Sequence, residues 1–232
     1  GLNAMIGDAS KTFSLEGIMK RMTIGLCLLL CAQAGWAKGR SSSGWVTITP
    51  QSNLDGWTRV AIPPSRPLNP GSQWKVDAVH HVIICQGNRG HEWLRYDHPY
   101  KNFVFEVQWR LTKVPGAKNY NSGVFVRNNE DGKIWYQAQV GSTDGGYFFG
   151  DNPENGALKR FNLKSLLSEN HMRLPGSWNT YKIRCVGKTL VLWVNGVKQS
   201  EFTQCSNPKG YVGLEAEGSL IQFRNLKIRE LP

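Results

Sequence analysis

Short runs of alternating apolar and polar residues recur along most of the chain, as expected for half-buried β-strands. Between residues 103 and 111, for example, Phe103, Phe105, Val107 and Trp109 fall on one side of an extended chain, and polar residues fall on the other. Such runs predict strands at residues 45–49, 74–76, 79–86, 103–111, 122–127, 135–140, 178–186, 189–194, 210–217 and 220–231.

The segments between these runs carry turn residues, whereas helical periodicity is nearly absent. Asn195 and Gly196 lie between two valines, which is the strongest short hairpin signal. Only residues 162–169 have a pattern that could form a short helix. We therefore predict an all-β fold in which about ten or more strands form a two-sheet sandwich.

The first part of the chain has the features of an export signal. Lys20 and Arg21 precede an apolar run at residues 22–34, and small residues follow it. We expect residues 1–37 to be an upstream segment with a secretory signal peptide, and residues 38–232 to be a single β-sandwich domain. The protein is then secreted or periplasmic. A buried core helix is the alternative for the apolar run.

The chain is strongly basic, with a formal net charge of +11 at pH 7. The basic residues are scattered, and residues 38–232 contain no basic run and no recognised nucleic-acid motif. Nucleic acid is therefore not the expected partner. We expect the positive charge to favour contact with an anionic envelope or polymer, or to serve no specific partner.

Three cysteines lie beyond the predicted signal, namely Cys85, Cys185 and Cys205. In an oxidising compartment at most one intramolecular pair can form among them, and we favour Cys185 with Cys205. Three buried, reduced thiols are the alternative. The spacings do not match a zinc site.

Several predicted strands have a polar face that carries more than lysine and serine. Trp135, Gln137 and Gln139 share one face of their strand, and Glu215 and Glu217 share one face of theirs. Aromatic rings stack on sugar rings, and amides and carboxylates hydrogen-bond to hydroxyls. These faces therefore predict a carbohydrate site, with an ordinary solvated sheet face as the alternative.

A third strand has the same character, since Glu106, Gln108 and Arg110 fall on its polar face.

His91 is the one histidine that we consider for a site, and it lies in a predicted loop. His80 and His81 are adjacent on a predicted strand, so they point to opposite faces and cannot hold one metal together.

Several segments, in order, resemble the 3-keto-disaccharide hydrolase domain family. The most characteristic is Asn-Ser-Gly-Val-Phe-Val-Arg at residues 121–127. The other matching segments are 54–57, 100–103, 106–110, 176–183, 193–196, 210–215 and 223–228. The resemblance implies a concanavalin A-like jelly roll of the lectin and glucanase type, in a bacterial protein that acts on oxidised glycosides.

The resemblance also implies a reaction with a clear physical logic. A ketone at C3 makes the C2 proton acidic, because the resulting carbanion is delocalised as an enolate. A base removes that proton, a cation or donor stabilises the enolate oxygen, the C1 substituent leaves, and water adds. Some family members use a divalent metal for this stabilisation, so a divalent metal is the one cofactor that we consider.

The sequence departs from the family pattern at two acidic positions. Gln137 stands where the family commonly has a glutamate, and Gln108 replaces another. Glutamine cannot act as a base and is a poor ligand for a hard cation. Any catalysis must then fall to Glu106, Glu215, Glu217 or a histidine.

These considerations give two sets of candidate residues. The expected catalytic residues are Arg127, Glu215 and Glu106, with Arg127 as a clamp for an enolate or hydroxyl, or else as a salt-bridge partner of Glu106 or Glu215. The expected substrate-binding residues are Gln137, Gln139, Gln108, Arg110, Trp135, Asn121, His91 and Glu217.

Three functions are compatible with the sequence. The first is an exported enzyme that cleaves the C1–O bond of an oxidised glycoside. The second is a non-catalytic carbohydrate-binding module on the same scaffold, which the two glutamines favour. The third is a structural or interaction protein of the envelope, since a fold does not fix a function.

Overall fold

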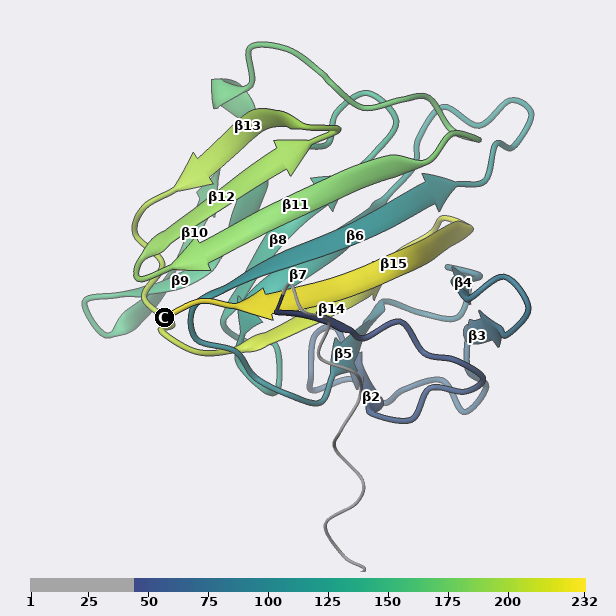
Figure 1. The fold of residues 1–232 in the computed structure, drawn as a ribbon, viewed down its shortest axis with the longest axis horizontal. Coiled ribbons are helices and arrows are strands. Elements are labelled where there is room, and N and C mark those ends of the chain that lie inside the picture. The colour runs from purple at the N-terminus through teal and green to yellow at the C-terminus, as the bar shows by residue number, and fades with distance from the viewer. Residues whose placement is uncertain (1–43) are drawn as a thin grey trace, which may run out of the picture. The chain divides into compact units, whose positions relative to one another are not determined.

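The computed structural model of the protein describes residues 44–232, in which strands form two sheets packed face to face (Figure 1). The first sheet has eight strands, in the order β13 (Val197–Phe202), β12 (Thr189–Val194), β11 (Asn179–Val186), β6 (Phe103–Leu111), β15 (Ile221–Glu230), β4 (Val82–Cys85) and β3 (Trp74–Asp77), with β1 (Trp45–Thr47) paired to β15. The second has seven, in the order β10 (Ala157–Asn162), β9 (Phe148–Glu154), β8 (Trp135–Val140), β7 (Ser122–Asn128), β14 (Tyr211–Ala216), β5 (Glu92–Tyr96) and β2 (Trp57–Ala61).

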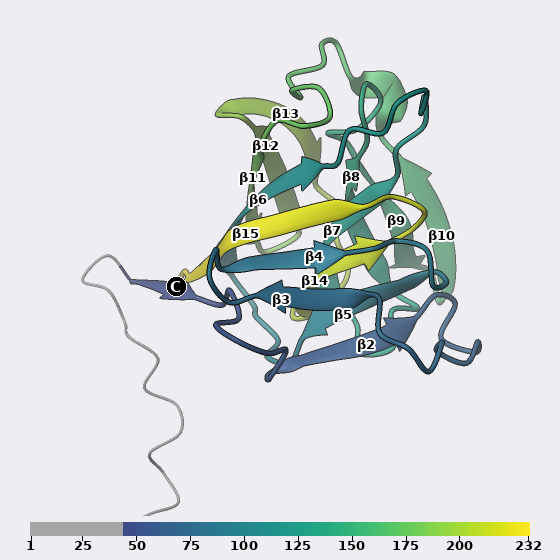
Figure 2. The ribbon, with the colours of Figure 1, turned by 90° about the vertical axis from the view of Figure 1, so that its right-hand side faces the viewer.

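All pairings between these strands are antiparallel, and the core lies between the two sheets (Figure 2). Along β6 the four apolar residues predicted to share a face are all fully buried, and the polar residues between them are half-buried on the outside. The period-two pattern of the sequence therefore produces the sandwich directly, and the predicted all-β fold is confirmed.

Several elements agree closely with the sequence, and the Asn195-Gly196 hairpin is one of them. It joins β12 to β13, and both residues have the positive φ angles of a type I′ turn. Residues 162–169 contain only a 3-10 helix, Lys164–Leu166. No helix among residues 44–232 is long and apolar enough to cross a membrane.

Other elements differ from the prediction. Five strands were not predicted: β2, β5, β9, β10 and β13. The strand predicted at residues 79–86 begins only at Val82, because a turn ends at His81, whose φ is +53°. His80 and His81 therefore do not lie on a strand. His80 instead bonds to Asp77.

The three cysteines at positions 85, 185 and 205 are buried as free thiols. The pair expected between Cys185 and Cys205 is therefore not formed, and the structure has the reduced alternative. Burial raises the pKa of the Cys85 thiol to about 12. The predicted signal peptide lies outside the described residues.

A bulge in β7 changes the direction of one important side chain. Two residues of β14, Tyr211 and Gly213, pair with Asn128 and Phe125, so β7 has one extra residue between them. Arg127 lies in this bulge with a φ of +57°. Its side chain consequently turns into the protein, although alternation from Phe125 would have placed it on the outer face.

Candidate functional site

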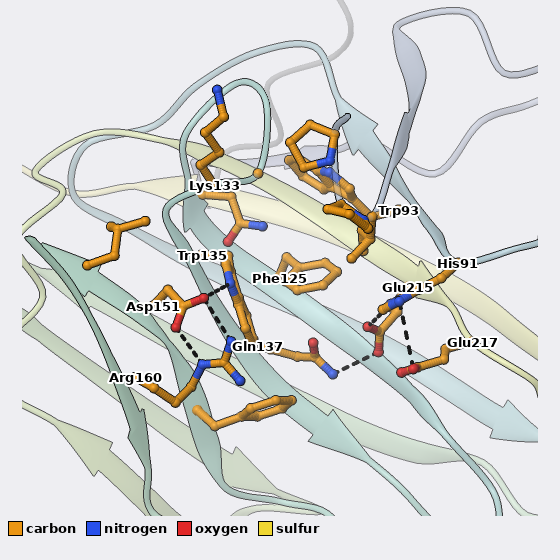
Figure 3. A pocket seen from close by; sticks show the side chains of 17 residues that line it. His91, Trp93, Phe125, Lys133, Trp135, Gln137, Asp151, Arg160, Glu215 and Glu217 are labelled. Carbon is orange, nitrogen blue, oxygen red and sulfur yellow. Dashed lines mark hydrogen bonds and ion pairs between the residues drawn. The ribbon is translucent and has the colours of Figure 1, made fainter. Parts of the chain in front are cut away.

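A cavity of about 460 Å³ opens on the outer face of the seven-stranded sheet, which is the face turned away from the core (Figure 3). Along β14 and β8, Glu215 and Gln137 point into this cavity, whereas Leu214 and Tyr136 point into the core. The residues used below line it: His91, Trp93, Phe125, Trp135, Gln137, Phe149, Asp151, Arg160, Glu215 and Glu217.

Strand register brings these side chains together from distant parts of the chain. Glu215 of β14 lies opposite Trp93 of β5, and Phe125 of β7 lies opposite Gln137 of β8. Side chains directly opposite each other on neighbouring strands are in contact distance. His91 immediately precedes β5, so it reaches Glu215 from the neighbouring strand.

His91 and two glutamates form one end of the cavity. Nε2 of His91 lies 2.8 Å from Oε1 of Glu215, and Nδ1 of His91 lies 3.7 Å from Oε1 of Glu217. The Glu215 side chain is almost fully buried, whereas that of Glu217 is 41% exposed. Glu217 is therefore the more accessible of the two carboxylates.

A chain of amide groups holds the two carboxylates in place. Gln137 Nε2 donates to Glu215 Oε2 at 2.7 Å and to Gln139 Oε1 at 3.0 Å. Gln139 Nε2 donates to Asn121 Oδ1 at 2.8 Å, and Asn121 Nδ2 donates to Glu217 Oε2 at 2.6 Å. These three residues, which we call the amide relay, connect one carboxylate to the other and fix their spacing.

Burial and charge shift the pKa values of two groups at this end of the cavity, which we call the acid end (His91, Glu215 and Glu217). Burial raises the pKa of Glu215, and the hydrogen bonds from His91 and Gln137 only partly offset this. Burial alone lowers the pKa of His91, but the hydrogen bond to Glu215 and the charges of Glu215 and Glu217 outweigh burial and raise it. Each of these two shifts favours the protonated form of its group.

The raised pKa of His91 predicts a pH-dependent contribution of this residue to stability. Folded His91 binds its proton more tightly than the unfolded residue, whose pKa is near 6.5. Its contribution is therefore complete below that value and is lost as the pH rises through the raised pKa. We expect the difference in melting temperature between the wild type and His91→Gln to shrink with rising pH in a thermal-shift titration. A difference that is constant or grows would contradict this.

The opposite end of the cavity carries a second charged group. Asp151 Oδ2 accepts hydrogen bonds from Trp135 Nε1 and from Arg160 Nη2, both at 2.9 Å. The Arg160 guanidinium also lies 5.0 Å from the centre of the Trp135 ring. Although burial acts in the opposite direction, the bonds from Arg160 and Trp135 lower the pKa of Asp151. Asp151 is therefore ionised and serves to position its neighbours.

The acid end also fits a divalent cation. One ligand atom each from His91, Glu215 and Glu217 lies within 4.8 Å of the others. One imidazole with two carboxylates is a donor set that suits first-row transition metals. The amide relay bonds to both carboxylates, Gln137 to Glu215 and Asn121 to Glu217. Such outer hydrogen bonds orient the ligands of a metal site.

The structure brings together most of the residues proposed from the sequence. The cavity contains His91, Trp135, Gln137, Glu215 and Glu217, and the amide relay adds Asn121 and Gln139 next to it. Gln137 and Gln139 were expected to contact sugar, but their Nε2 groups bond to protein oxygens. Their observed contacts are those of positioning residues.

Four proposed residues lie elsewhere. Arg127 is fully buried in the interior, where its Nη1 donates to the Asn207 carbonyl at 2.8 Å, and it pairs with neither Glu106 nor Glu215. Because Glu106, Gln108 and Arg110 belong to β6, they lie on the outer face of the other sheet. Glu106 forms an ion pair there with Lys227 at 2.8 Å.

The sequence analysis missed Phe125, Asp151 and Arg160 as site residues. Phe125 could have been found, because it is opposite Gln137 once β7 and β8 are aligned. The positions of Asp151 and Arg160 are set by the hairpin of β9 and β10. The sequence of this hairpin lacks a clear alternating pattern, so the two residues could not be placed from it.

Three of the solved structures that share this architecture are described as carbohydrate-related proteins. A candidate glycosyl hydrolase from Parabacteroides distasonis ATCC 8503 has a TM-score of 0.59 at 17% identity, over 82% of this chain and 95% of that chain. The carbohydrate-binding module CBM66 from Bacillus subtilis gives 0.55 at 18% identity, over 76% and 97%. The β-glucanase of Bacillus licheniformis gives 0.50 at 13% identity, over 83% and 100%.

At these identities the likeness shows the fold, and it confirms the concanavalin-like jelly roll. No curated protein sequence matches the chain. A family model described as a 3-keto-alpha-glucoside-1,2-lyase-like domain does match, over residues 44–229, which includes every strand from β1 to β14 and nearly all of β15. The chain therefore belongs to this 3-keto-glycoside lyase-like family, and its function is related to carbohydrates.

Proposed function

We propose that the protein cleaves the glycosidic C1–O bond of 3-keto glycosides in the cavity of the seven-stranded sheet. The observation that carries the proposal is the acid end, where an imidazole and two carboxylates meet and an amide relay fixes them. The reaction removes the C2 proton, expels the C1 substituent by elimination, and adds water to the resulting enone. The net change is hydrolysis.

In this proposal Glu217 is the base. It is the accessible carboxylate of the site, and the bond from Asn121 occupies only its Oε2. Its Oε1, which lies 3.7 Å from Nδ1 of His91, is the oxygen that accepts the C2 proton. A base that is positioned in this way contributes about 10²–10⁴-fold to the rate.

His91 supplies the positive charge that the enolate requires. Its pKa is raised by the hydrogen bond to Glu215 and by the charges of Glu215 and Glu217, which favours the protonated form. Its Nε2 is engaged with Glu215, which orients the ring and leaves Nδ1 on the side of Glu217. A protonated Nδ1 can then donate to the developing oxyanion. Glu215 acts as a positioning residue because it is buried.

A divalent cation would be held by His91, Glu215 and Glu217, and when bound it would polarise the C3 ketone as a Lewis acid. With the cation bound, the amide relay would still position the carboxylates and the aromatic residues would still line the cavity. Trp93, Phe125 and Trp135 line the cavity, and the half-buried Trp135 provides a ring against which a pyranose can pack.

The test is to incubate the purified protein with 3-keto-disaccharides and with the matching non-oxidised disaccharides. Reactions are run with chelator and with a panel of divalent metals. We expect release of the leaving sugar from the 3-keto forms only, because only they have an acidic C2 proton. No release under any condition would refute the proposal.

The alternative is a non-catalytic carbohydrate-binding module, and one observation favours it. Gln137 and Gln108 occupy family positions that commonly carry acids, and both are engaged in hydrogen bonds within the protein. Calorimetry with the same disaccharides decides between the two functions. Binding without turnover in every metal condition supports a module.

A further inference from the structure

The eight-stranded sheet carries a second polar surface, on the side of the molecule opposite the cavity. Strand register defines it as four rows of outward side chains, which we call the outer basic face. The rows are Lys75–Ile84–Gln222–Arg110, Arg224–Gln108–Thr180, Lys227–Glu106–Lys182–Trp193–Lys198, and Trp45–Arg229–Val104–Arg184–Val191–Glu201.

Positive charge predominates on this face. The four rows contain eight basic and two acidic side chains, and the two acidic ones, Glu106 and Glu201, are paired with Lys227 and Lys198. Asp77 at the rim bonds to His80. Among the ion pairs of residues 44–232, none involves the other six basic residues of the face: Lys75, Arg110, Lys182, Arg184, Arg224 and Arg229.

Two of these unpaired charges meet at one tryptophan. The guanidinium of Arg224 lies 3.9 Å from the centre of the Trp178 ring, and that of Arg110 lies 4.6 Å from it. Trp178 directly precedes β11 and is half-buried. A cavity of about 380 Å³ opens here, lined by both arginines, Trp178, Gln222 and Asp77 among others.

The two guanidiniums are held by neutral groups. Arg224 Nε donates to Gln108 Oε1 at 2.9 Å, and Arg110 Nε donates to Gln222 Oε1 at 2.9 Å. An amide oxygen fixes the orientation of a guanidinium without neutralising its charge. The arginines therefore keep their full charge and remaining N–H donors in a fixed arrangement, which is a preorganised anion site.

We propose that the outer basic face binds an anionic polysaccharide, with the carboxylate of a uronic acid residue held by Arg110 and Arg224. The planar guanidinium matches a planar carboxylate in bidentate geometry. Trp178 and Gln222, which line the same cavity, lie beside the two arginines and can contact the sugar ring. Lys182, Arg184 and Arg229 extend the positive charge across the sheet for neighbouring acidic units.

This surface is separate from the cavity of the proposed reaction, because the two lie on different sheets and face away from each other. It provides a way to retain the protein on an acidic glycan while the cavity handles small substrates. The binding proposal and the catalytic proposal can therefore fail independently.

The experiment measures binding to polygalacturonate by calorimetry, with fully methyl-esterified polygalacturonate and a single-stranded DNA oligonucleotide as comparison ligands. The test variant is Arg110→Gln/Arg224→Gln. The matched control is Lys159→Gln/Lys209→Gln, which removes the same charge from two exposed residues outside the eight-stranded sheet.

We expect salt-sensitive binding of polygalacturonate, weakened at least about tenfold in the test variant and little changed in the control, since hydrogen bonds between charged groups are stronger than neutral ones. The ester should not bind measurably. Equal binding of the ester, equal weakening in both variants, no binding by the wild type, or binding of DNA alone would overturn the proposal. If circular dichroism shows that the double variant is unfolded, Arg224→Lys is measured instead. This substitution keeps the positive charge but removes the planar guanidinium that binds a carboxylate through two donors. Undiminished binding by Arg224→Lys would count against the proposal.

Discussion

Glu217→Gln is expected to lower kcat on a 3-keto disaccharide by about 10²–10⁴-fold, the contribution of a positioned general base. Glutamine keeps the size of the side chain and can still bond to Asn121, but it cannot accept a proton. The Glu217 side chain is 41% exposed, so the substitution should leave the melting temperature nearly unchanged. Steady-state kinetics and thermal unfolding measured on the same preparation separate the two effects.

Glu169→Gln is the matched control, because Glu169 is 74% exposed and its ion pair is with His171, outside the cavity. It removes the same charge and should retain wild-type kcat. A Glu217→Gln protein with wild-type turnover would exclude Glu217 as the base. Saturation with each divalent metal during the assay prevents weakened cation binding from being mistaken for loss of the base.

Gly123→Ala is expected to reduce activity about 10–100-fold without contact between the new methyl group and substrate, the usual cost of disturbing groups that orient ligands. A Cβ atom at position 123 would lie 2.3 Å from Nε2 of Gln137 and 2.4 Å from its Cδ. Gln137 must then move, and its bonds to Glu215 and Gln139 break. The backbone of Gly123 is not in the left-handed region, so alanine itself is tolerated there.

A double-mutant cycle tests this interpretation. Gln137→Ala removes the bond to Glu215 directly, and in that background Gly123→Ala has no glutamine to displace. The two substitutions should therefore be non-additive, with the double variant as active as Gln137→Ala alone. Additive losses in kcat/KM would show that Gly123 acts by another route.

The sequence predicted the sandwich well because its core strands are alternating or aromatic-rich apolar runs that turn residues separate. The β6, β8 and β12 boundaries agree with the alternating runs to the residue. The strand β5 was missed because Glu92 and Arg95 interrupt its apolar pattern, although Glu92 is buried and bonded to Arg59 and Trp74. Ion pairs and hydrogen bonds that satisfy a buried acid depend on distant residues, which a local pattern does not contain.

The candidate site was predicted only in part, because the side chains that meet there depend on strand order and register as well as on alternation. Parity correctly placed Gln137 and Glu215 on one surface, but it failed for Arg127, because one extra residue in β7 reverses the side-chain direction. Glu106 and Arg110 have the right alternation yet belong to the other sheet. Alternation identifies a polar face, whereas strand order decides which polar faces meet.

The two ends of the cavity rest on parts of the fold that differ in how freely they can change. His91, Glu215 and Gln137 come from inner strands or directly precede one, while Arg160 and Leu158 come from β10, an edge strand whose residues are mostly exposed. Substitutions in β10 disturb little of the core. Under the proposed function, laboratory selection at this edge hairpin can therefore change which sugars are accepted while the reacting groups stay constant.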